Sequence, residues 1–212
     1  LKDFYIEKGI SKDKIIVAHD AVDLRDFDIT VDKNDVRQKL GIPLDKPVAM
    51  YLGRLDPWKG VETLLETSLL LPEVTVVIAG EGSQFKEFKK KYPNVIFLGN
   101  TPYRDLPRNQ RAADVLVVPN SGKSDVSRLY TSPLKVFAHM ASGVPIVASD
   151  LPSLREVLNE ENSTLVESDN PKALANGVKM ALKLNKNGKN ALRDVMLYTW
   201  TRRVKDVVRF VI

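Results

Sequence analysis

The sequence has no cysteine and only two histidines, His19 and His139, among its 212 residues. The absence of cysteine excludes a disulfide framework, a thiolate metal site and a cysteine nucleophile. Two histidines leave little material for a histidine-rich metal centre. No apolar run approaches the roughly 20 residues that a membrane span needs, and no signal-peptide pattern opens the chain.

Excess charge and aromatic residues are also scarce. The chain has 32 Lys and Arg against 27 Asp and Glu, for a net charge of +5, and 7% aromatic residues. A nucleic-acid surface usually combines a basic stripe with aromatic residues, whereas the longest basic cluster here is Lys89-Lys90-Lys91. We therefore expect no nucleic-acid partner. The charge is typical of a solvated surface, or of weak attraction to phosphate-bearing ligands or an anionic membrane.

What the chain does have is a series of short apolar runs rich in β-branched residues, each followed by an amphipathic stretch. Runs that are apolar on both faces are typical of strands covered by helices on both sides. The alternation predicts an α/β fold in one domain, residues 1–212: a Rossmann-like, doubly wound parallel sheet of about six strands flanked by helices. The expected strands are Ile15–Ala18, Val48–Leu52, Val74–Ala79, Val95–Leu98, Val115–Val118 and Pro145–Ser149, and the expected helices lie near Val61–Leu71, Gln84–Lys91, Arg104–Ala113 and Ser132–Ala141.

Beyond Ser149 the pattern becomes a helical tail. We expect a short helix at Pro152–Leu158, a brief extended piece at Thr164–Val166, and longer helices at Pro171–Leu184 and Thr199–Ile212. Ligands of open α/β sheets bind at the carboxyl ends of the strands, so the loops that follow the strands are the candidates for function.

The first such loop, Gly53–Gly60, follows the strand expected at Val48–Leu52. Gly53 lets the backbone approach a ligand closely. Arg54 offers a planar fork of donors and Lys59 a flexible point charge, which together suit a diphosphate. The residues alone are equally compatible with two surface cations around a turn.

The second loop, Gly80-Glu81-Gly82-Ser83, also follows an expected strand and opens a helix. A dinucleotide fingerprint needs a third glycine where Phe85 stands, and strands already precede this turn. The loop therefore indicates a tight turn close to a ligand at Gly80 and Gly82, rather than a bound nicotinamide cofactor.

The third candidate is the start of the helix that ends at Gly143. Ser132 is a natural N-cap, and Pro133 fits the first helical position. A phosphate there would meet free backbone N–H groups, the positive end of the helix dipole and the ammonium of Lys135. Because a basic residue in a first turn opposes the dipole, Lys135 favours a bound anion.

Other polar residues do not add a site. His139 lies in the body of that helix, so we interpret it as a surface or core histidine rather than a catalyst. His19 has no favoured role. Asp26-Phe27-Asp28 matches the D-x-D string of metal-dependent sugar transferases but has no further ligands at a useful spacing. We therefore expect no metal site.

Taken in order, these segments resemble the carboxyl-terminal, nucleotide-sugar-binding domain of retaining glycosyltransferases with the GT-B fold, family 4. The resemblance covers nearly the whole chain. It rests on His19–Phe27 (N-G-V-D-x-x-x-F), Gly53–Gly60 (G-R-L-x-x-x-K-G), Gly80–Gly82 (G-x-G), Ala112–Val115 (a-D-v), Ser132–Ser149 (S-P-L-K-x-F-E-Y-M-A-x-G-x-P-I-V-A-S) and Tyr198–Arg203 (Y-x-W-x-x-R).

The resemblance implies a hexosyltransferase half that binds a UDP- or GDP-linked sugar and needs no further cofactor. Arg54 and Lys59 would be the catalytic residues, because they hold the donor diphosphate and offset charge on the departing nucleotide without a metal. Leu134 and its backbone neighbours would face the diphosphate, and the loop Gly99–Tyr103, with Tyr103 at its end, would receive the base. Tyr130 stands where the first glutamate of the family's E-x7-E motif would be.

The sequence departs from the family at Ala138, where the second glutamate of E-x7-E would bind the ribose hydroxyls. The loss removes a charge-assisted hydrogen bond of about 1.5–3 kcal/mol. Three alternatives follow from this loss. The protein binds its donor weakly, it holds the ribose with another residue, or it is a non-catalytic relative that serves in binding or interaction. A GT-B sugar-nucleotide epimerase is a further alternative, although it lacks the S-P-L-K helix pattern.

The first residue is Leu1 rather than Met, so we expect a piece of a longer chain whose acceptor-binding half precedes it. That half would bind a glycan or lipid-linked acceptor for polysaccharide assembly. The resemblance places this chemistry in the cytoplasm, with peripheral contact at the inner face of the membrane. The isolated domain would bind nucleotide but turn over nothing.

Overall fold

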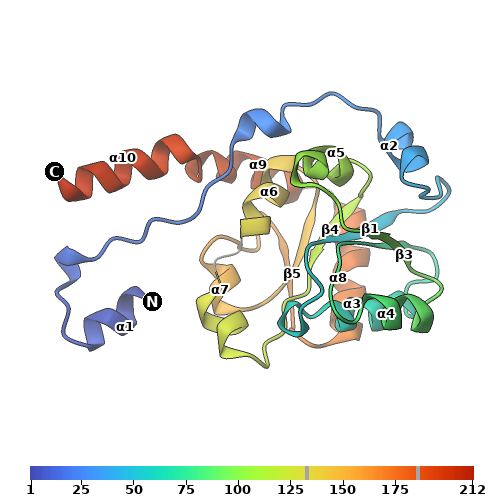
Figure 1. The fold of residues 1–212 in the computed structure, drawn as a ribbon, viewed down its shortest axis with the longest axis horizontal. Coiled ribbons are helices and arrows are strands. Elements are labelled where there is room, and N and C mark those ends of the chain that lie inside the picture. Colours follow the sequence, from blue (N-terminus) through green and yellow to red (C-terminus); the bar gives the residue numbers. More distant parts are fainter. Residues whose placement is uncertain (132–133, 185–186) are drawn as a thin grey trace.

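Six parallel strands form one sheet in the computed structural model of the chain, which describes residues 1–131, 134–184 and 187–212 (Figure 1). The strand order is β3-β2-β1-β4-β5-β6. The chain therefore builds outward from β1 in one direction, returns to the centre, and builds outward from β4 in the other. The strands are β1 (Val48–Leu52), β2 (Thr75–Ala79), β3 (Ile96–Gly99), β4 (Val115–Val118), β5 (Ile146–Ser149) and β6 (Thr164–Val166).

Helices cover both faces of the sheet, because strands such as β1 carry apolar side chains on both faces. Ala49 and Tyr51 enter one core cluster, whereas Val48, Met50 and Leu52 enter another, because successive side chains of a strand point to opposite faces. The first face packs against α3 (Val61–Ser68), α4 (Phe85–Lys91) and α8 (Pro171–Leu184). The second packs against α2 (Lys33–Lys39), α5 (Leu106–Gln110), α6 (Leu134–Ser142) and α9 (Asn187–Asp194). The predicted doubly wound α/β sheet is confirmed.

One predicted strand was wrong. Ile15–Ala18 pairs with no strand of the sheet and leaves Val17 51% exposed, because a short apolar run becomes a strand only when a neighbour offers a hydrogen-bonding edge. The sixth strand is instead β6, which pairs in parallel with β5 from Val147↔Thr164 to Ser149↔Val166. The sequence indicated this segment only as a brief extended piece.

Several helices differ from their predicted bounds. The stretch expected at Arg104–Ala113 divides into a 3-10 turn and α5, and the helix expected at Pro152–Leu158 is the shorter α7 (Pro152–Arg155). The sequence did not predict α2, which Asp32 caps by accepting from the N–H groups of Asn34 and Asp35 at 2.8 and 3.0 Å. Neither α1 (Lys2–Glu7) nor α9 was predicted. The remaining short turns are η1 (Lys12–Lys14), η2 (Leu24–Phe27), η3 (Pro57–Lys59), η4 (Tyr103–Asp105), the π-helical η5 (Val126–Tyr130) and η6 (Val195–Leu197).

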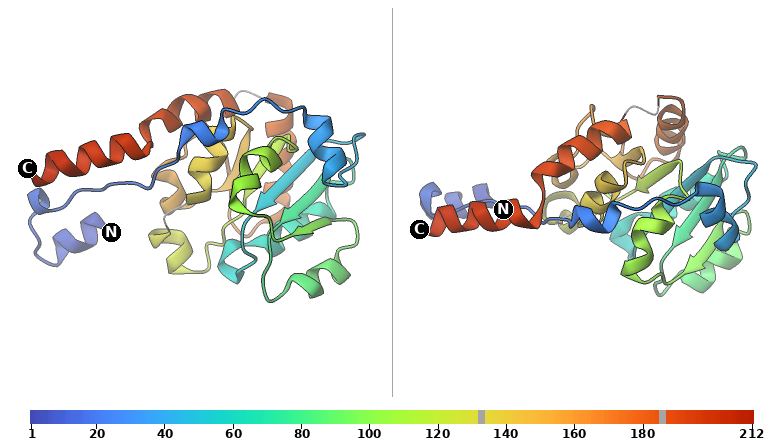
Figure 2. Two further views of the ribbon diagram at one scale, coloured as in Figure 1. Left: turned by 45° about the horizontal axis from the view of Figure 1, so that its top comes forward. Right: turned by 90° about the horizontal axis from the view of Figure 1, so that it is seen from above.

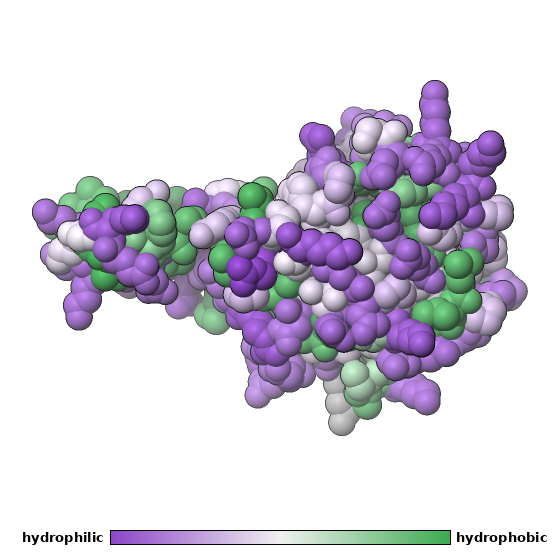
Figure 3. Space-filling model, turned by 90° about the horizontal axis from the view of Figure 1, so that it is seen from below, coloured by the Kyte–Doolittle hydropathy of each residue, from purple (hydrophilic) through white to green (hydrophobic). Residues whose placement is uncertain are grey.

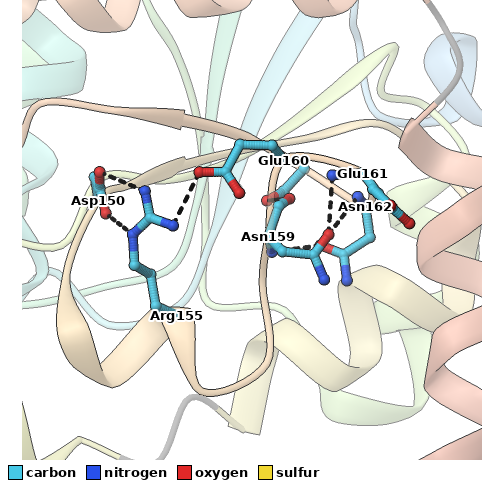
Figure 4. Close-up of polar contacts among 7 residues, drawn as sticks. Asp150, Arg155, Asn159, Glu160, Glu161 and Asn162 are labelled. Atoms are coloured by element: carbon cyan, nitrogen blue, oxygen red, sulfur yellow. Dashed lines mark hydrogen bonds and ion pairs between the residues drawn. The ribbon is translucent and has the colours of Figure 1, made fainter.

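Polar contacts hold the connection between β5 and β6 (Figure 4). Arg155 of α7 pairs with Asp150, directly after β5, and with Glu160 at 2.9 Å. Asn159 accepts from the backbone N–H of Glu161 at 2.9 Å. These side chains are partly exposed, so each ion pair stabilises the fold by no more than about 1 kcal/mol. Their effect is to hold α7 against the end of β5.

The two ends of the chain leave the domain on the same side (Figures 1 and 2). Residues near the start join the last helix, α10 (Trp200–Val211), through a parallel bridge between Val22 and Thr199 and an ion pair of 2.5 Å between Asp20 and Arg203. α10 has no buried residue. Figure 3 shows hydrophobic side chains among hydrophilic ones on the projection that the two ends of the chain form. None of the helices described is long and apolar enough to cross a membrane.

Candidate functional site

A cavity of about 1420 Å³ opens at the carboxyl edge of the sheet. Its walls come from the loops that follow β1, β2, β3 and β4 and from the first turns of α6. The cavity lies where the strand order reverses between β1 and β4, which is where open α/β sheets bind their ligands.

Most of the residues singled out in the sequence meet in this cavity. Tyr130 lies in η5, is 46% exposed and is not among the lining residues. Ser132 and Pro133 lie outside the described residues. The predicted residues that do line the cavity are Gly53, Arg54, Lys59, Gly80, Gly82, Tyr103, Leu134, Lys135 and Ala138.

Two glycines bring the loops after β1 and β2 into direct backbone contact. Gly80 has a φ of +154°, and a Cβ there would lie 1.8 Å from the carbonyl oxygen of Gly53. A Cβ on Gly82 would lie 2.9 Å from Leu55. The N–H of Leu55 donates to the carbonyl of Glu81 at 3.0 Å. Because no side chain separates these loops, they form a narrow shared floor for the cavity.

Lys135 lies at the centre of this floor. Its Nζ atom is buried, has no hydrogen-bond partner and lies 4.1 Å from the ring centre of Tyr51. A Cβ added to Gly53 would approach Nζ within 3.1 Å, so the missing side chain leaves room for the ammonium. Burial lowers the pKa of Lys135 well below its usual value, and the charge of Lys59 lowers it further.

Lys59 and Arg54 lie above Lys135 at the rim. Lys59 Nζ lies 3.6 Å from the ring centre of Trp58, and burial lowers the pKa of Lys59 to about 8 against the opposing charge of Asp56. Arg54 is exposed and approaches Asp56 at 3.3 Å. Asp56 thus acts on three basic side chains, and Glu81 and Lys86 also line the cavity, so basic groups outnumber carboxylates there. The arrangement can bind an anion that carries more than one negative charge.

Sequence reasoning missed two polar residues of the cavity, His139 and Asn120. The Nδ1 atom of His139 lies 2.8 Å from Gln110 Nε2, while its Nε2 atom is buried without a partner. Asn120, two residues after β4, buries Oδ1 without a partner. The sequence left open whether His139 lies at the surface or in the core; it is buried, and it also lines the cavity. Its spacing of four residues from Lys135, which puts both on one helix face, was the signal available.

The remaining wall is less polar. Ala21 and Val22 of the opening segment and Trp200 of α10 lie on it, with Trp200 50% exposed. Asn100, Thr101 and Tyr103 after β3 close the opposite side. Within residues 1–131, 134–184 and 187–212, no three His, Cys, Asp or Glu side chains group closely enough to hold a metal ion.

Solved structures with the same fold define the class of this domain. Sucrose-phosphate synthase from Thermosynechococcus elongatus matches 98% of this chain and 55% of its own, with a TM-score of 0.78 and 25% identity. Anabaena Alr3699/HepE in complex with UDP-glucose matches 99% of this chain and 60% of its own, with a TM-score of 0.83 and 20% identity. The fold is the Rossmann-like domain of GT-B glycosyltransferases.

The family follows from the sequence. Residues 32–194, more than half of the chain, match the family described as glycosyl transferases group 1, so the chain belongs to this family. The uncharacterized glycosyltransferase MJ1607 of Methanocaldococcus jannaschii is 28% identical over 93% of the chain. The chain spans 53% of the length of MJ1607, or about half.

Proposed function

We propose that the chain is the donor-binding domain of a family 4 glycosyltransferase that transfers a hexose from a nucleoside diphosphate sugar with retention of configuration. The observation that carries the proposal is the meeting of Arg54, Lys59 and Lys135 at one cavity. A diphosphate supplies the negative charge that these side chains lack.

The same cations would also assist the departure of the nucleoside diphosphate from the sugar. Negative charge grows on the diphosphate as the bond to the sugar breaks, so groups aimed at it stabilise the transition state more than the ground state. The Arg54 side chain is exposed and can follow the leaving group, while Lys135 is buried with Nζ 4.1 Å from the ring centre of Tyr51. Charge stabilisation of this kind operates without a metal ion.

The nucleoside has room beside the diphosphate. Asn100, Thr101 and Tyr103 line the cavity on the side of the β3–α5 connection, and Tyr103 is 67% exposed, which leaves its ring free to stack on a base. The solved relative Alr3699/HepE holds UDP-glucose. We assign the donor as a UDP- or GDP-linked sugar.

The acceptor belongs to the rest of the protein. The chain spans about half of MJ1607, and a donor domain needs a facing surface that holds the acceptor and excludes water during transfer. We propose a glycan or lipid-linked acceptor for polysaccharide assembly at the cytoplasmic face of a membrane.

Calorimetric titration with UDP and GDP tests the proposal. We expect saturable binding of at least one nucleotide, weakened about tenfold or more in Arg54→Ala and in Lys59→Ala because each loses a charged contact of about 1.5–3 kcal/mol. Lys89→Ala, which removes an exposed cation of α4 away from the cavity, is the matched control. No heat with either nucleotide at millimolar concentration contradicts the proposal.

A second candidate function rests on Ala138, which is 4% exposed and lines the cavity with a methyl group. A non-catalytic relative would keep the nucleotide site and lose turnover. In the full-length protein, a large gain in affinity or turnover in Ala138→Glu supports this second function. An unchanged affinity supports the transferase with a different anchor for the nucleoside.

A further inference from the structure

Buried polar atoms without a partner gather at the cavity. Of six such side-chain atoms among the described residues, three belong to residues that line it: Asn120 Oδ1, Lys135 Nζ and His139 Nε2. Native proteins leave few buried polar groups unpaired, since each costs free energy that water would otherwise recover. Three in one cavity indicate a ligand that supplies the missing partners. The diphosphate accounts for Lys135 but not for the other two.

The proton on His139 can be assigned from its neighbour. In the amide orientation that the structure gives Gln110, its Nε2 atom lies 2.8 Å from His139 Nδ1. An amide nitrogen donates, so in this orientation Nδ1 accepts and the ring hydrogen is on Nε2. Burial and the charge of Lys135 lower the pKa of His139 to about 3, which keeps the ring neutral at ordinary pH. His139 therefore buries an N–H donor with no acceptor. An oxygen atom is the natural partner.

The Nε2–H group of His139 lies away from the residues proposed to contact the diphosphate. Lys135 reaches the β1 side of the cavity, at Tyr51 and Gly53. One turn further along α6, His139 contacts α5 through Gln110, and Leu106 of α5 lines the same cavity beside Tyr103. His139 thus lies toward the β3–α5 connection, the side on which the proposed function puts the nucleoside.

We propose that His139 is a binding residue for the nucleoside part of the donor, donating from Nε2 to a neutral oxygen atom of that group, with Asn120 Oδ1 as an acceptor for a nearby hydroxyl. This inference rests on the proposed function. The oxygen belongs either to a ribose hydroxyl or to a carbonyl of the base. Ala138, the residue before His139, contributes no polar group, so His139 supplies the hydrogen bond from this turn of α6.

The test uses a double variant, Gln110→Leu with His139→Phe. Removing both partners leaves no unpaired amide behind, and phenylalanine keeps the volume of the ring, so the fold should hold. Calorimetry compares four ligands: the nucleoside diphosphate that binds the unaltered protein, its 2′-deoxy form, its 3′-deoxy form, and inorganic pyrophosphate. We expect the variant to bind the nucleotide about 5- to 10-fold more weakly and pyrophosphate as before.

The deoxy forms identify the oxygen. If the variant loses affinity for the nucleotide but not for one deoxy form, the oxygen is that ribose hydroxyl. If the nucleotide and both deoxy forms lose affinity equally while pyrophosphate does not, the oxygen belongs to the base. His19→Phe alters the other histidine, which does not line the cavity, and this variant should bind all four ligands normally.

Two binding results overturn the inference. One is a folded double variant that binds the nucleotide as tightly as the unaltered protein, and the other is an equal loss for nucleotide and pyrophosphate. A ¹⁵N spectrum of the two histidine rings provides an independent check, because His139 must carry its hydrogen on Nε2, and the opposite tautomer refutes the assignment. If the unaltered protein binds no nucleotide, the proposed function fails and this inference fails with it. If the unaltered protein binds nucleotide and only the double variant behaves against expectation, this inference alone fails.

Discussion

At the scale of single residues, the cavity keeps side chains in conditions that only a ligand relieves. The Lys135 amine is buried with Nζ 4.1 Å from the ring centre of Tyr51, and both burial and the charge of Lys59 disfavour its charged form. Lys59 is half-buried against Trp58. Both amines are poorly solvated and lack a close anionic partner, so a diphosphate gains more from them than from surface lysines.

The pKa of Lys59 leads to a pH dependence. In the free protein this pKa is about 8, and a bound diphosphate favours the charged amine. Nucleotide affinity should therefore be highest below pH 8 and should fall as the pH rises from about 8 to 10 and Lys59 loses its proton. Calorimetry across this range measures the effect. Lys59→Met should bind more weakly at pH 7 and lose this part of the decline; an unaltered decline in that variant would show that another group is responsible.

Replacing the buried lysine should separate stability from binding. Lys135→Met removes a buried amine without a hydrogen-bond partner and keeps the apolar stem, so the free energy of unfolding should rise by about 1–3 kcal/mol. Pyrophosphate binding should weaken about tenfold or more. Urea unfolding and calorimetry measure the two effects. Lys123→Met, at an exposed position, is the control, and a destabilised Lys135→Met would contradict this account.

At the scale of elements, the site depends on how two strand-to-helix loops pass each other. The loop after β1 and the loop after β2 touch at Gly53 and Gly80, and the N–H of Gly53 donates to the carbonyl of Ala79 at 2.9 Å. The glycine pattern in the sequence indicated tight turns near a ligand. The partner of each turn could not be predicted, because it depends on the parallel register of β1 with β2.

Gly80→Ala should therefore damage both the fold and the site. The new Cβ would lie 1.8 Å from the carbonyl oxygen of Gly53, and the φ of +154° is unfavourable for alanine, so we expect a loss of about 3–5 kcal/mol in unfolding free energy. Gly99→Ala meets nothing closer than 3.6 Å and should lose about 1–2 kcal/mol from its φ of +73°. Chemical denaturation compares the two. Equal losses would mean that backbone strain alone, not the contact between loops, decides the effect.

At the scale of the whole molecule, residues near the two ends of the chain complete the domain. Asp20 and Arg203 are 183 positions apart and pair directly. Val22 N–H donates to the carbonyl of Tyr198 at 3.0 Å, and Phe137 of α6 packs against Tyr198 with ring centres 5.0 Å apart. This junction places Trp200 on the cavity wall.

Arg203→Met should loosen this junction and leave the sheet intact. The ion pair is partly exposed, so its loss should cost about 1 kcal/mol or less in global stability. Amide hydrogen exchange should become faster at Val22, while the amides of β1 remain protected. Lys205→Met, which alters another exposed cation of α10, is the matched control. Unchanged exchange at Val22 would show that the backbone bridge holds the junction without the ion pair.

The sequence by itself determined the α/β class, five of the six strands to within one residue at each end, and the loops that form the cavity. These features depend on local patterns: β-branched runs, glycines at turns and cations after strands. Only the tertiary structure replaced Ile15–Ala18 with β6 and placed His139 and Asn120 at the cavity. A strand edge and a buried donor without a partner are relations between distant segments. Such relations arise when the chain packs, so local sequence patterns do not contain them.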